Sequence, residues 1–320
     1  MVNSKILATG SYIPEKVYTN DYLSTIVDTS DEWITERTGI KERRIVSENE
    51  LTSDLACKAC EDAIKSAGIN LEEIDAIILA TTTPDMTLPS TSAIVQKKLG
   101  IKNNCFCFDI QAVCSGFVYA LTVADNFIKA GTIKKALVVG AESMSKIIDW
   151  SDRNTCVLFG DGAGAVILEA TEDKSKGILA SSLHCNGEYM DLLKTTGGPC
   201  LNQETGFLEM QGREVFKLAV NKMFDSIQES LQKANLTLED IDLLVPHQAN
   251  KRILDSLAKK LGVPEDKVII TLDKHGNTSA GSIPLALDFA NKSGKLKDND
   301  VFVMEALGGG LTWGSVVVRW

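Results

Sequence analysis

The sequence lacks the marks of a membrane-spanning, secreted or nucleic-acid-binding chain. No run of 18 or more apolar residues occurs, so no membrane-spanning helix is predicted. The opening residues, MVNSKILATGSYIPE, contain no apolar core followed by a small-residue cleavage site, and we expect no signal peptide. Acidic residues outnumber basic ones by 43 to 33, and the net charge of −10 argues against general affinity for nucleic acids or anionic lipids. The default expectation is therefore a cytoplasmic protein.

Histidine is scarce, with three residues, whereas cysteine is present eight times. An even cysteine count indicates disulfides mainly in short secreted chains, so we expect reduced thiols here. Cys57 and Cys60 form a CxxC pair inside an amphipathic helical pattern, with no second Cys or His pair nearby. Because a structural zinc site needs four ligands, we interpret the pair as core cysteines and expect no metal.

Apolar runs alternate with helical patterns, and no proline-rich linker interrupts them. The runs are continuous rather than alternating, which indicates strands covered on both faces, and the chain is predicted to be α/β. Helical patterns cover 54–67, 213–234 and 250–261. FGDGAGAV (159–166) lacks a GxGxxG that opens a helix, so we interpret it as a tight turn between strands. The strand-like runs are IDAIILA (74–80), ALVVGA (136–141), GAVILE (164–169), IDLLVP (241–246) and DVFVMEA (300–306).

Four short segments recur in the same order, with spacings of 167, 162, 163 and 163 residues. Single matches of this kind arise by chance, but four at nearly one spacing indicate two copies of one βα unit. We therefore expect an N-terminal half at 1–170 and a C-terminal half at 171–320, packed face to face or side by side. The matching positions are Leu71 with Leu238, Lys97 with Lys259, Lys129 with Lys292, and Glu142 with Glu305.

The stretch DIQAVCSGFVYAL (109–121) places Cys114 at the corner between a strand-like run and an apolar helix expected at 115–130. A free thiol is mostly protonated at neutral pH, and the amides and dipole of a helix N-terminus favour the thiolate. Gly116 leaves space beside the sulfur. We predict that Cys114 is a nucleophile; a core cysteine is the alternative.

Two polar corners in the second half are candidates to meet Cys114. A spacing of 163 residues leads from Cys114 to Asn277, in KHGNTSAGS, and His247 follows a strand in PHQANKR. Strand carboxyl ends are where open α/β sheets place their sites. A neutral His247 and Asn277 can both donate hydrogen bonds to an oxygen that gains negative charge. We assign His275, two residues before Asn277, a structural role.

In this order, AVCSGF, PHQAN and HGNTSAGS resemble the Cys, His and Asn motifs of the 3-oxoacyl-acyl-carrier-protein synthase III family, which initiates bacterial fatty-acid synthesis. TSDEWITERTGIKERR (29–44), FGDGAGAV and EALGGGLTWGS (305–315) are similar to further signatures, so the resemblance covers the whole chain. It implies the thiolase fold, a duplicated arrangement of five αβαβα layers. The elongating condensing enzymes have a second histidine where this chain has Asn277, so the sequence does not resemble that class. Biosynthetic thiolases use a second catalytic cysteine, and no cysteine follows Cys200 here.

The resemblance implies a reaction in two steps without a cofactor, since the CoA thioester is a substrate. Cys114 takes the acyl group of an acyl-CoA primer, acetyl-CoA foremost, and CoA leaves. Malonyl-acyl-carrier protein then loses CO₂, and His247 and Asn277 stabilise the enolate that attacks the acyl group. Backbone amides of Cys114, Gly309 and Gly310 form the oxyanion hole. The alternatives are a related enzyme that makes another β-keto product or only transfers acyl groups, and a non-catalytic scaffold of the same fold.

The resemblance also implies where the substrates bind. Trp33 and Arg37 are four residues apart, hence on one helix face, and suit an adenine and phosphates; a packing anchor is the alternative for Trp33. The implied CoA contacts are Thr29, Trp33, Arg37, Thr38, Arg153 and Gly212. Because this chain is acidic, an acidic carrier protein would need a local patch of basic residues to bind. The alternative interpretation of these basic residues is that they are ordinary solvated side chains on exposed helix faces. The implied docking residues are Gln248, Ala249, Asn250, Lys251, Arg252, Lys217 and Lys259.

The resemblance further implies a homodimer in which Leu88 of one subunit and Leu307 of the other shape the acyl pocket. Some relatives carry Phe at these positions, so the smaller leucines favour a pocket wider than acetyl alone requires. NNCFCFDI (103–110) has no polar alternation, and we expect it to be an edge strand that pairs with the partner subunit and is covered on both faces.

Overall fold

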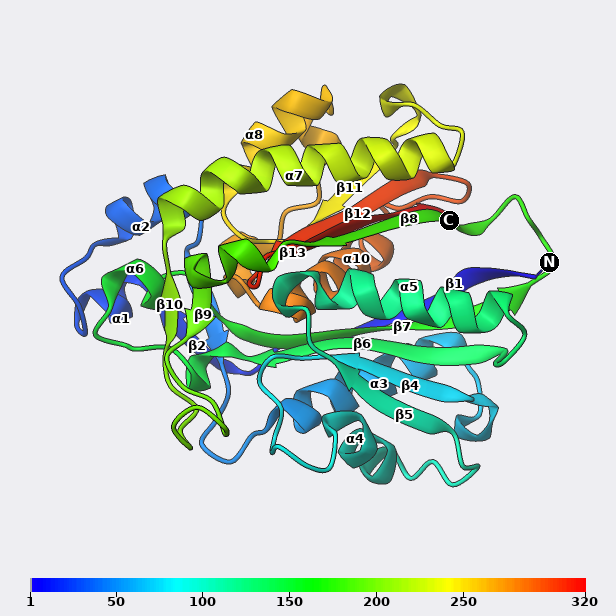
Figure 1. Cartoon of the computed structure of the whole chain (residues 1–320), viewed down its shortest axis with the longest axis horizontal. Coiled ribbons are helices and arrows are strands. Elements are labelled where there is room, and N and C mark those ends of the chain that lie inside the picture. Colours follow the sequence, from blue (N-terminus) through cyan, green and yellow to red (C-terminus); the bar gives the residue numbers. More distant parts are fainter. Residues whose placement is uncertain (1) are drawn as a thin grey trace.

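The computed structural model describes residues 2–320. Two β-sheets stack face to face in it, with helices between them and on both outer faces (Figure 1). The first sheet has the strand order β1-β7-β6-β4-β5 and the second has the order β11-β12-β13-β8. The strands of the first sheet are β1 (Asn3–Tyr12), β4 (Ala76–Ala80), β5 (Phe106–Ile110), β6 (Lys135–Ser143) and β7 (Asp161–Thr171). Those of the second are β8 (Gly177–Cys185), β11 (Leu243–Pro246), β12 (Val301–Gly308) and β13 (Thr312–Arg319).

The helices complete five layers in the order helix, sheet, helix, sheet, helix, which confirms the arrangement expected from the resemblance. Between the sheets lie α5 (Gly116–Lys129) and α10 (Ser282–Lys292), whose apolar side chains join both sheets in one core cluster. The outer face of the first sheet packs against α3 (Thr52–Ala67) and α4 (Thr91–Leu99). The outer face of the second packs against α7 (Gly212–Lys233) and α8 (Lys251–Leu261).

Short elements gather at one end of the sheets, opposite the end where the two chain termini lie (Figure 1). Two small sheets pair β2 with β3 and β9 with β10. The short elements are β2 (Lys16–Thr19), α1 (Asn20–Ser24), α2 (Asp31–Thr38), β3 (Glu42–Ile45), α6 (Arg153–Cys156), β9 (Leu193–Thr195), β10 (Leu208–Met210) and α9 (Leu272–His275).

Among residues 2–320, no helix combines the length and the apolar composition that a membrane crossing requires.

The continuous apolar runs are strands buried on both faces, as predicted. All five residues of β4 are buried, and β12 sends Phe302 into the central core cluster and Val303 into the outer one. Two expectations were wrong. Strands and helices do not alternate throughout, because β6, β7 and β8 follow one another and β6 pairs with β7 antiparallel. FGDGAGAV leads into β7 rather than forming a turn between strands, and Gly164 there lets α10 approach, since a Cβ would lie 2.6 Å from the backbone nitrogen of Leu285.

The two copies of the repeat contact each other at two matching turns, Val113–Ser115 and Ser279–Gly281. These turns precede α5 and α10, respectively. Both begin with a non-glycine residue in the left-handed region, at φ 49° for Val113 and 47° for Ser279. The counterpart of Cys114 is therefore Ala280 and not Asn277. The spacing of 163 residues predicted the wrong counterpart because it relates the C-terminal ends of the two helices. Since α10 has 11 residues and α5 has 14, the residues before the two helices are related by a larger spacing.

Candidate active site

A cavity of about 680 Å³ brings together Cys114, His247 and Asn277 from three distant parts of the chain. Cys114 comes from the turn before α5, His247 from the end of β11, and Asn277 from the segment between α9 and α10. Their exposed fractions are 4%, 2% and 6%, so the reactive groups lie at the closed end of the cavity. The two polar corners therefore converge on the cysteine, as the sequence predicts.

Cys114 is held as a buried thiol. The helix α5 starts at Gly116, one residue later than the expected start at 115, and Cys114 lies in the short turn before it. Burial raises the pKa of the Cys114 thiol to about 12, while a hydrogen bond with Ser279 acts in the opposite direction. The expected stabilisation of the thiolate by the helix end is thus opposed by a larger loss of hydration. The resting cysteine keeps its proton at neutral pH.

His247 is neutral and carries its proton on the nitrogen that faces the cavity. Its Nδ1 lies 2.7 Å from the hydroxyl of Ser282, and that hydroxyl oxygen also accepts the backbone N–H of Gln248 at 3.3 Å. Since the Ser282 hydroxyl has no other acceptor among the described residues, we infer that it donates to Nδ1 and leaves the proton on Nε2. Burial lowers the pKa of His247 to about 3, so the ring remains uncharged.

Asn277 presents its amide nitrogen to the cavity. Its side-chain oxygen accepts the backbone N–H of Ser279 at 2.8 Å, which fixes the amide orientation. Its backbone is fixed too, because its N–H donates to the carbonyl of Leu158 at 2.8 Å and its carbonyl accepts from Gly160 at 3.0 Å. Asn277 and the Nε2 of His247 are therefore two preorganised donors in one cavity.

Sequence reasoning missed the residues that support this triplet. Ser282 orients His247, and it stands in the HGNTSAGS segment three places after Ser279. The hydroxyl of Ser279 donates to the fully buried Glu142 at 3.1 Å. Glu142 also accepts the backbone N–H groups of Thr82 and Thr83 at 3.0–3.1 Å, so it joins the 81–83 loop to the Asn277 segment. The serines beside the asparagine could have been singled out as hydrogen-bond partners; the role of Glu142 needs the fold.

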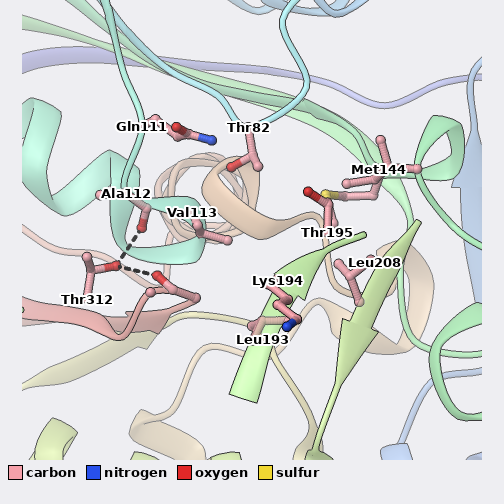
Figure 2. Close-up of a pocket in the computed structure, with 13 residues that line it drawn as sticks. Thr82, Gln111, Ala112, Val113, Met144, Leu193, Lys194, Thr195, Leu208 and Thr312 are labelled. Atoms are coloured by element: carbon pink, nitrogen blue, oxygen red, sulfur yellow. Dashed lines mark hydrogen bonds between the residues drawn. The ribbon is translucent and has the colours of Figure 1, made fainter. Parts of the chain in front are cut away.

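A second cavity, of about 320 Å³, is lined by Ala112 and Val113, the two residues before the cysteine (Figure 2). Leu193 lines both cavities. The wall of the second cavity is mostly apolar, and it includes Ala112 and Val113 but not Cys114. The predicted oxyanion residues Gly309 and Gly310 line this cavity rather than the larger one. The remaining lining residues are Thr82, Gln111, Met144, Ile147, Lys194, Thr195, Leu208 and Thr312.

The predicted CoA residues lie at the mouth of the larger cavity, with two exceptions. Trp33, Arg37, Thr38 and Gly212 line it, whereas Thr29 and Arg153 do not. The guanidinium carbons of Arg37 and Arg153 nevertheless lie 4.6 and 4.9 Å from the centre of the Trp33 ring. The indole is therefore already in contact with two cations, which an adenine ring would have to join or displace.

The predicted docking residues fall into three groups. Gln248 is 1% exposed and bonds internally to Pro246, Ile269 and Thr271, so its assignment to a docking surface was wrong. Lys251 and Lys217 lie on the surface but pair with Asp255 and Glu214 on their own helices. The third group, Ala249, Asn250 and Arg252, lines the larger cavity, as Lys217 also does. Lys259 is exposed on α8 and lines neither cavity.

Arg213 and Arg252 both line the cavity mouth and make no ion pair with any described residue.

His275, which we assigned a structural role, is not among the cavity residues, and burial lowers its pKa to about 4. The predicted pocket residues separate as well. Leu307 lines the larger cavity, while Leu88 is 77% exposed and lines neither cavity of its own chain.

Comparison with known proteins gives one consistent family. Models of 3-oxoacyl-[acyl-carrier-protein (ACP)] synthase III and of its C-terminal part match residues 108–187 and 231–320. A beta-ketoacyl-[acyl-carrier-protein] synthase III from Ehrlichia canis is 55% identical over 319 residues, which cover 100% of both chains. The crystal structure of 3-oxoacyl-[acyl-carrier-protein] synthase III from Aquifex aeolicus VF5 is 50% identical, with a TM-score of 0.94 and coverage of 99% of this chain and 100% of that one. The priming beta-ketosynthase of the R1128 polyketide pathway is 34% identical, with a TM-score of 0.94 and coverage of 99% and 96%.

Proposed function

The chain belongs to the 3-oxoacyl-[acyl-carrier-protein] synthase III family, and we propose that it condenses an acyl-CoA primer, acetyl-CoA foremost, with malonyl-acyl-carrier protein. The products are 3-oxoacyl-carrier protein, CO₂ and CoA, and the reaction initiates fatty-acid synthesis. One observation carries the proposal: a buried thiol and two neutral, preorganised hydrogen-bond donors line the same cavity.

In the first step the sulfur of Cys114 attacks the thioester carbonyl of acyl-CoA. The bond from the carbonyl carbon to the CoA sulfur breaks, and the proton of the Cys114 thiol leaves with CoA. The backbone amides of Cys114, Gly309 and Gly310 are the proposed donors to the oxygen of the tetrahedral intermediate. Removing one donor of this kind typically costs about 100- to 1000-fold in rate.

In the second step the malonyl group loses CO₂, and the electron pair of the broken bond forms an enolate. The enolate oxygen accepts hydrogen bonds from Nε2 of His247 and from the Asn277 amide. Neutral donors suit this task, because they stabilise the developing charge without giving up a proton beforehand. The enolate carbon then attacks the acyl carbonyl, and the Cys114 sulfur leaves and takes up a proton, as its raised pKa favours.

The two cavities suggest where the substrates lie. We place the adenine of CoA at Trp33, its phosphates at Arg37 and Arg153, and the acyl chain in the second cavity. The partner subunit's Leu88 would complete that cavity in a homodimer. The chain as a whole has a net charge of −10, which would repel an acidic carrier protein. The unpaired Arg213 and Arg252 provide a local basic surface to which such a protein can bind.

The remaining parts of the proposal concern organisation and location. The halves 1–170 and 171–320 would act as two thiolase-like units, the first supplying the nucleophile and the second supplying His247 and Asn277. A cytoplasmic location agrees with the eight cysteines, all of which are free thiols in the structure.

The decisive experiment supplies the purified protein with radiolabelled acetyl-CoA and malonyl-acyl-carrier protein. We expect stoichiometric CO₂ and labelled 3-oxoacyl-carrier protein, with little product when malonyl-CoA replaces the carrier-protein substrate. Acyl-enzyme without CO₂ would instead identify an acyl-transfer enzyme. Absence of both acyl-enzyme and product would identify a scaffold, and either result would overturn the proposed reaction.

A further inference from the structure

Val113, which precedes the nucleophile, holds a conformation that valine rarely adopts. Its φ of 49° lies in the left-handed region, where a β-branched side chain is a steric outlier. Ser279, in the matching turn of the second half, has almost the same φ but no branch at Cβ. An unbranched or smaller residue would therefore meet the demands of this turn with less strain, and outliers of this kind cluster at functional sites.

The backbone around Val113 is fixed on both sides and cannot relax the strain by moving. The carbonyl of Ala112 accepts the hydroxyls of Ser115 at 2.8 Å and Thr312 at 2.9 Å. On the other side, Gly308 packs so closely that a Cβ on it would lie 2.7 Å from the Cys114 nitrogen. The direction of the Val113 side chain is therefore determined by the turn.

That direction leads into the second cavity. Val113 lines it and faces Met144 and Leu208 across it, whereas the next residue, Cys114, lines the larger cavity (Figure 2). An acyl group bound to the Cys114 sulfur and extending into the second cavity has to pass Val113 with its first carbons. The branched Cβ of Val113 is then part of the cavity wall that the carbon next to the reacting carbonyl has to pass.

We propose that Val113 determines specificity by excluding acyl groups that are branched at the carbon next to the carbonyl. The inference rests on the proposed function. Straight chains pass beside the side chain, while a second substituent on that carbon meets one of its two methyl groups. In a close-packed pocket, one methylene group changes discrimination by about 10- to 200-fold.

The test compares isobutyryl-CoA with acetyl-CoA, as the ratio of their kcat/KM values for acyl-enzyme formation. We expect Val113→Ala to raise this ratio at least about 10-fold. Val113→Thr keeps the branched shape and should keep the wild-type ratio. Val118→Ala, a buried change in α5 that lines neither cavity, controls for lost packing and should leave the ratio unchanged.

A second measurement needs no enzymatic turnover. Iodoacetamide and 2-iodopropionamide differ by one methyl group on the reacting carbon, and peptide mapping reports alkylation of Cys114 separately from the other cysteines. Val113→Ala should raise the relative rate of the branched reagent, and Val113→Thr should not. Ratios that stay within twofold of wild type in both assays would overturn the role of Val113. A wild-type protein that forms no acyl-enzyme would overturn the proposed function, and the alkylation assay would still decide on Val113.

Discussion

The hydroxyl of Thr312 lies 2.9 Å from the carbonyl oxygen of Ala112, which precedes it by 200 residues (Figure 2). The same hydroxyl lies 3.3 Å from the carbonyl oxygen of Gly309 and 2.8 Å from the hydroxyl of Ser115. The proposed oxyanion donors stand on the two segments that it joins, the cysteine turn and the triple-glycine turn. One threonine therefore sets the relative position of amides contributed by the two halves.

Replacing Thr312 should impair acyl transfer in proportion to the lost hydrogen bonds. Thr312→Val preserves the shape and removes the hydroxyl, and we expect a roughly 10-fold lower rate, less than the cost of deleting an oxyanion donor. Thr312→Ser keeps the hydroxyl and should restore most of the rate. Single-turnover release of CoA measures the effect. An equal loss in both variants, with a lower melting temperature, would assign Thr312 a packing role instead.

The three central residues should separate the two half-reactions. Cys114→Ala should abolish acylation, because it removes the nucleophile. His247→Ala and Asn277→Ala should leave the acyl-enzyme detectable and mainly block decarboxylation, because both act on the enolate. Intact-mass spectrometry after incubation with acetyl-CoA, together with CO₂ release, checks each variant. An acylated Cys114→Ala protein would place the nucleophile elsewhere.

The reactivity of Cys114 should increase with pH over a wide range. Burial raises its pKa to about 12, so the thiolate fraction grows about tenfold per pH unit between pH 7 and pH 10. Alkylation by iodoacetamide, followed on the peptide that contains Cys114, should rise in parallel without a plateau. A plateau below pH 8.5 would mean that the helix N-terminus outweighs burial, as the sequence alone suggested.

Short sequence motifs singled out three residues that the structure brings to one cavity, Cys114, His247 and Asn277. Cys114 and His247 each follow a segment whose apolar pattern predicts a buried strand, and such strands end at the same side of a sheet. Asn277 was singled out by its motif instead, and in the structure it follows the short helix α9. The α/β class and the duplication follow from the same patterns. Trp33 and Arg37 were paired correctly because helical spacing alone brings them together.

Features that depend on packing between distant segments could not be predicted. Gln248 stands beside His247 in the motif, yet its side chain turns inward to bond Ile269 and Thr271. The burial that keeps Cys114 protonated arises from two sheets and two helices meeting, whereas the sequence shows only the local helix. The true counterpart of Cys114 was missed because a shortened α10 changes the repeat spacing between the turn and the helix end.

Glu305 should make the protein less stable as the pH rises. It is fully buried, neither carboxylate oxygen has a hydrogen-bond partner among the described residues, and burial raises its pKa well above the usual range. The unfolded chain releases this proton at a pKa of about 4.3, whereas the folded protein retains it to a higher pH. Between these two pKa values the free energy of unfolding therefore falls by about 1.4 kcal/mol for each pH unit of increase.

Glu305→Gln removes the titration and keeps the shape. Its free energy of unfolding relative to wild type should therefore increase between pH 4.5 and pH 6.5, measured by urea unfolding at several pH values. A constant difference between the two proteins across this range would show that Glu305 is ionised and hydrated in the native state.

The exposed edge of the first sheet is a candidate surface for assembly. β5 is an edge strand of the first sheet, as expected, but Phe106 on it is 38% exposed, so the strand is not covered on both faces by its own chain. An exposed edge with apolar side chains invites pairing with an identical edge, and we predict a homodimer in solution. Light scattering at micromolar concentration checks the mass, and a fully active monomer would defeat the prediction.

Dimerisation and primer choice should be coupled through Leu88, which is 77% exposed in a single chain. A leucine so exposed gains from burial against a partner, and a bulkier ring at that position would narrow the partner's acyl cavity. We expect Leu88→Phe to reduce activity with butyryl-CoA, and with acyl-CoA branched farther along the chain than the carbon next to the carbonyl, relative to acetyl-CoA, without lowering the melting temperature. Ile26→Phe, at an exposed apolar position that lines neither cavity, serves as the matched control. If Leu88→Phe kept the wild-type preference among these substrates while remaining dimeric, the partner's Leu88 would have no part in the pocket.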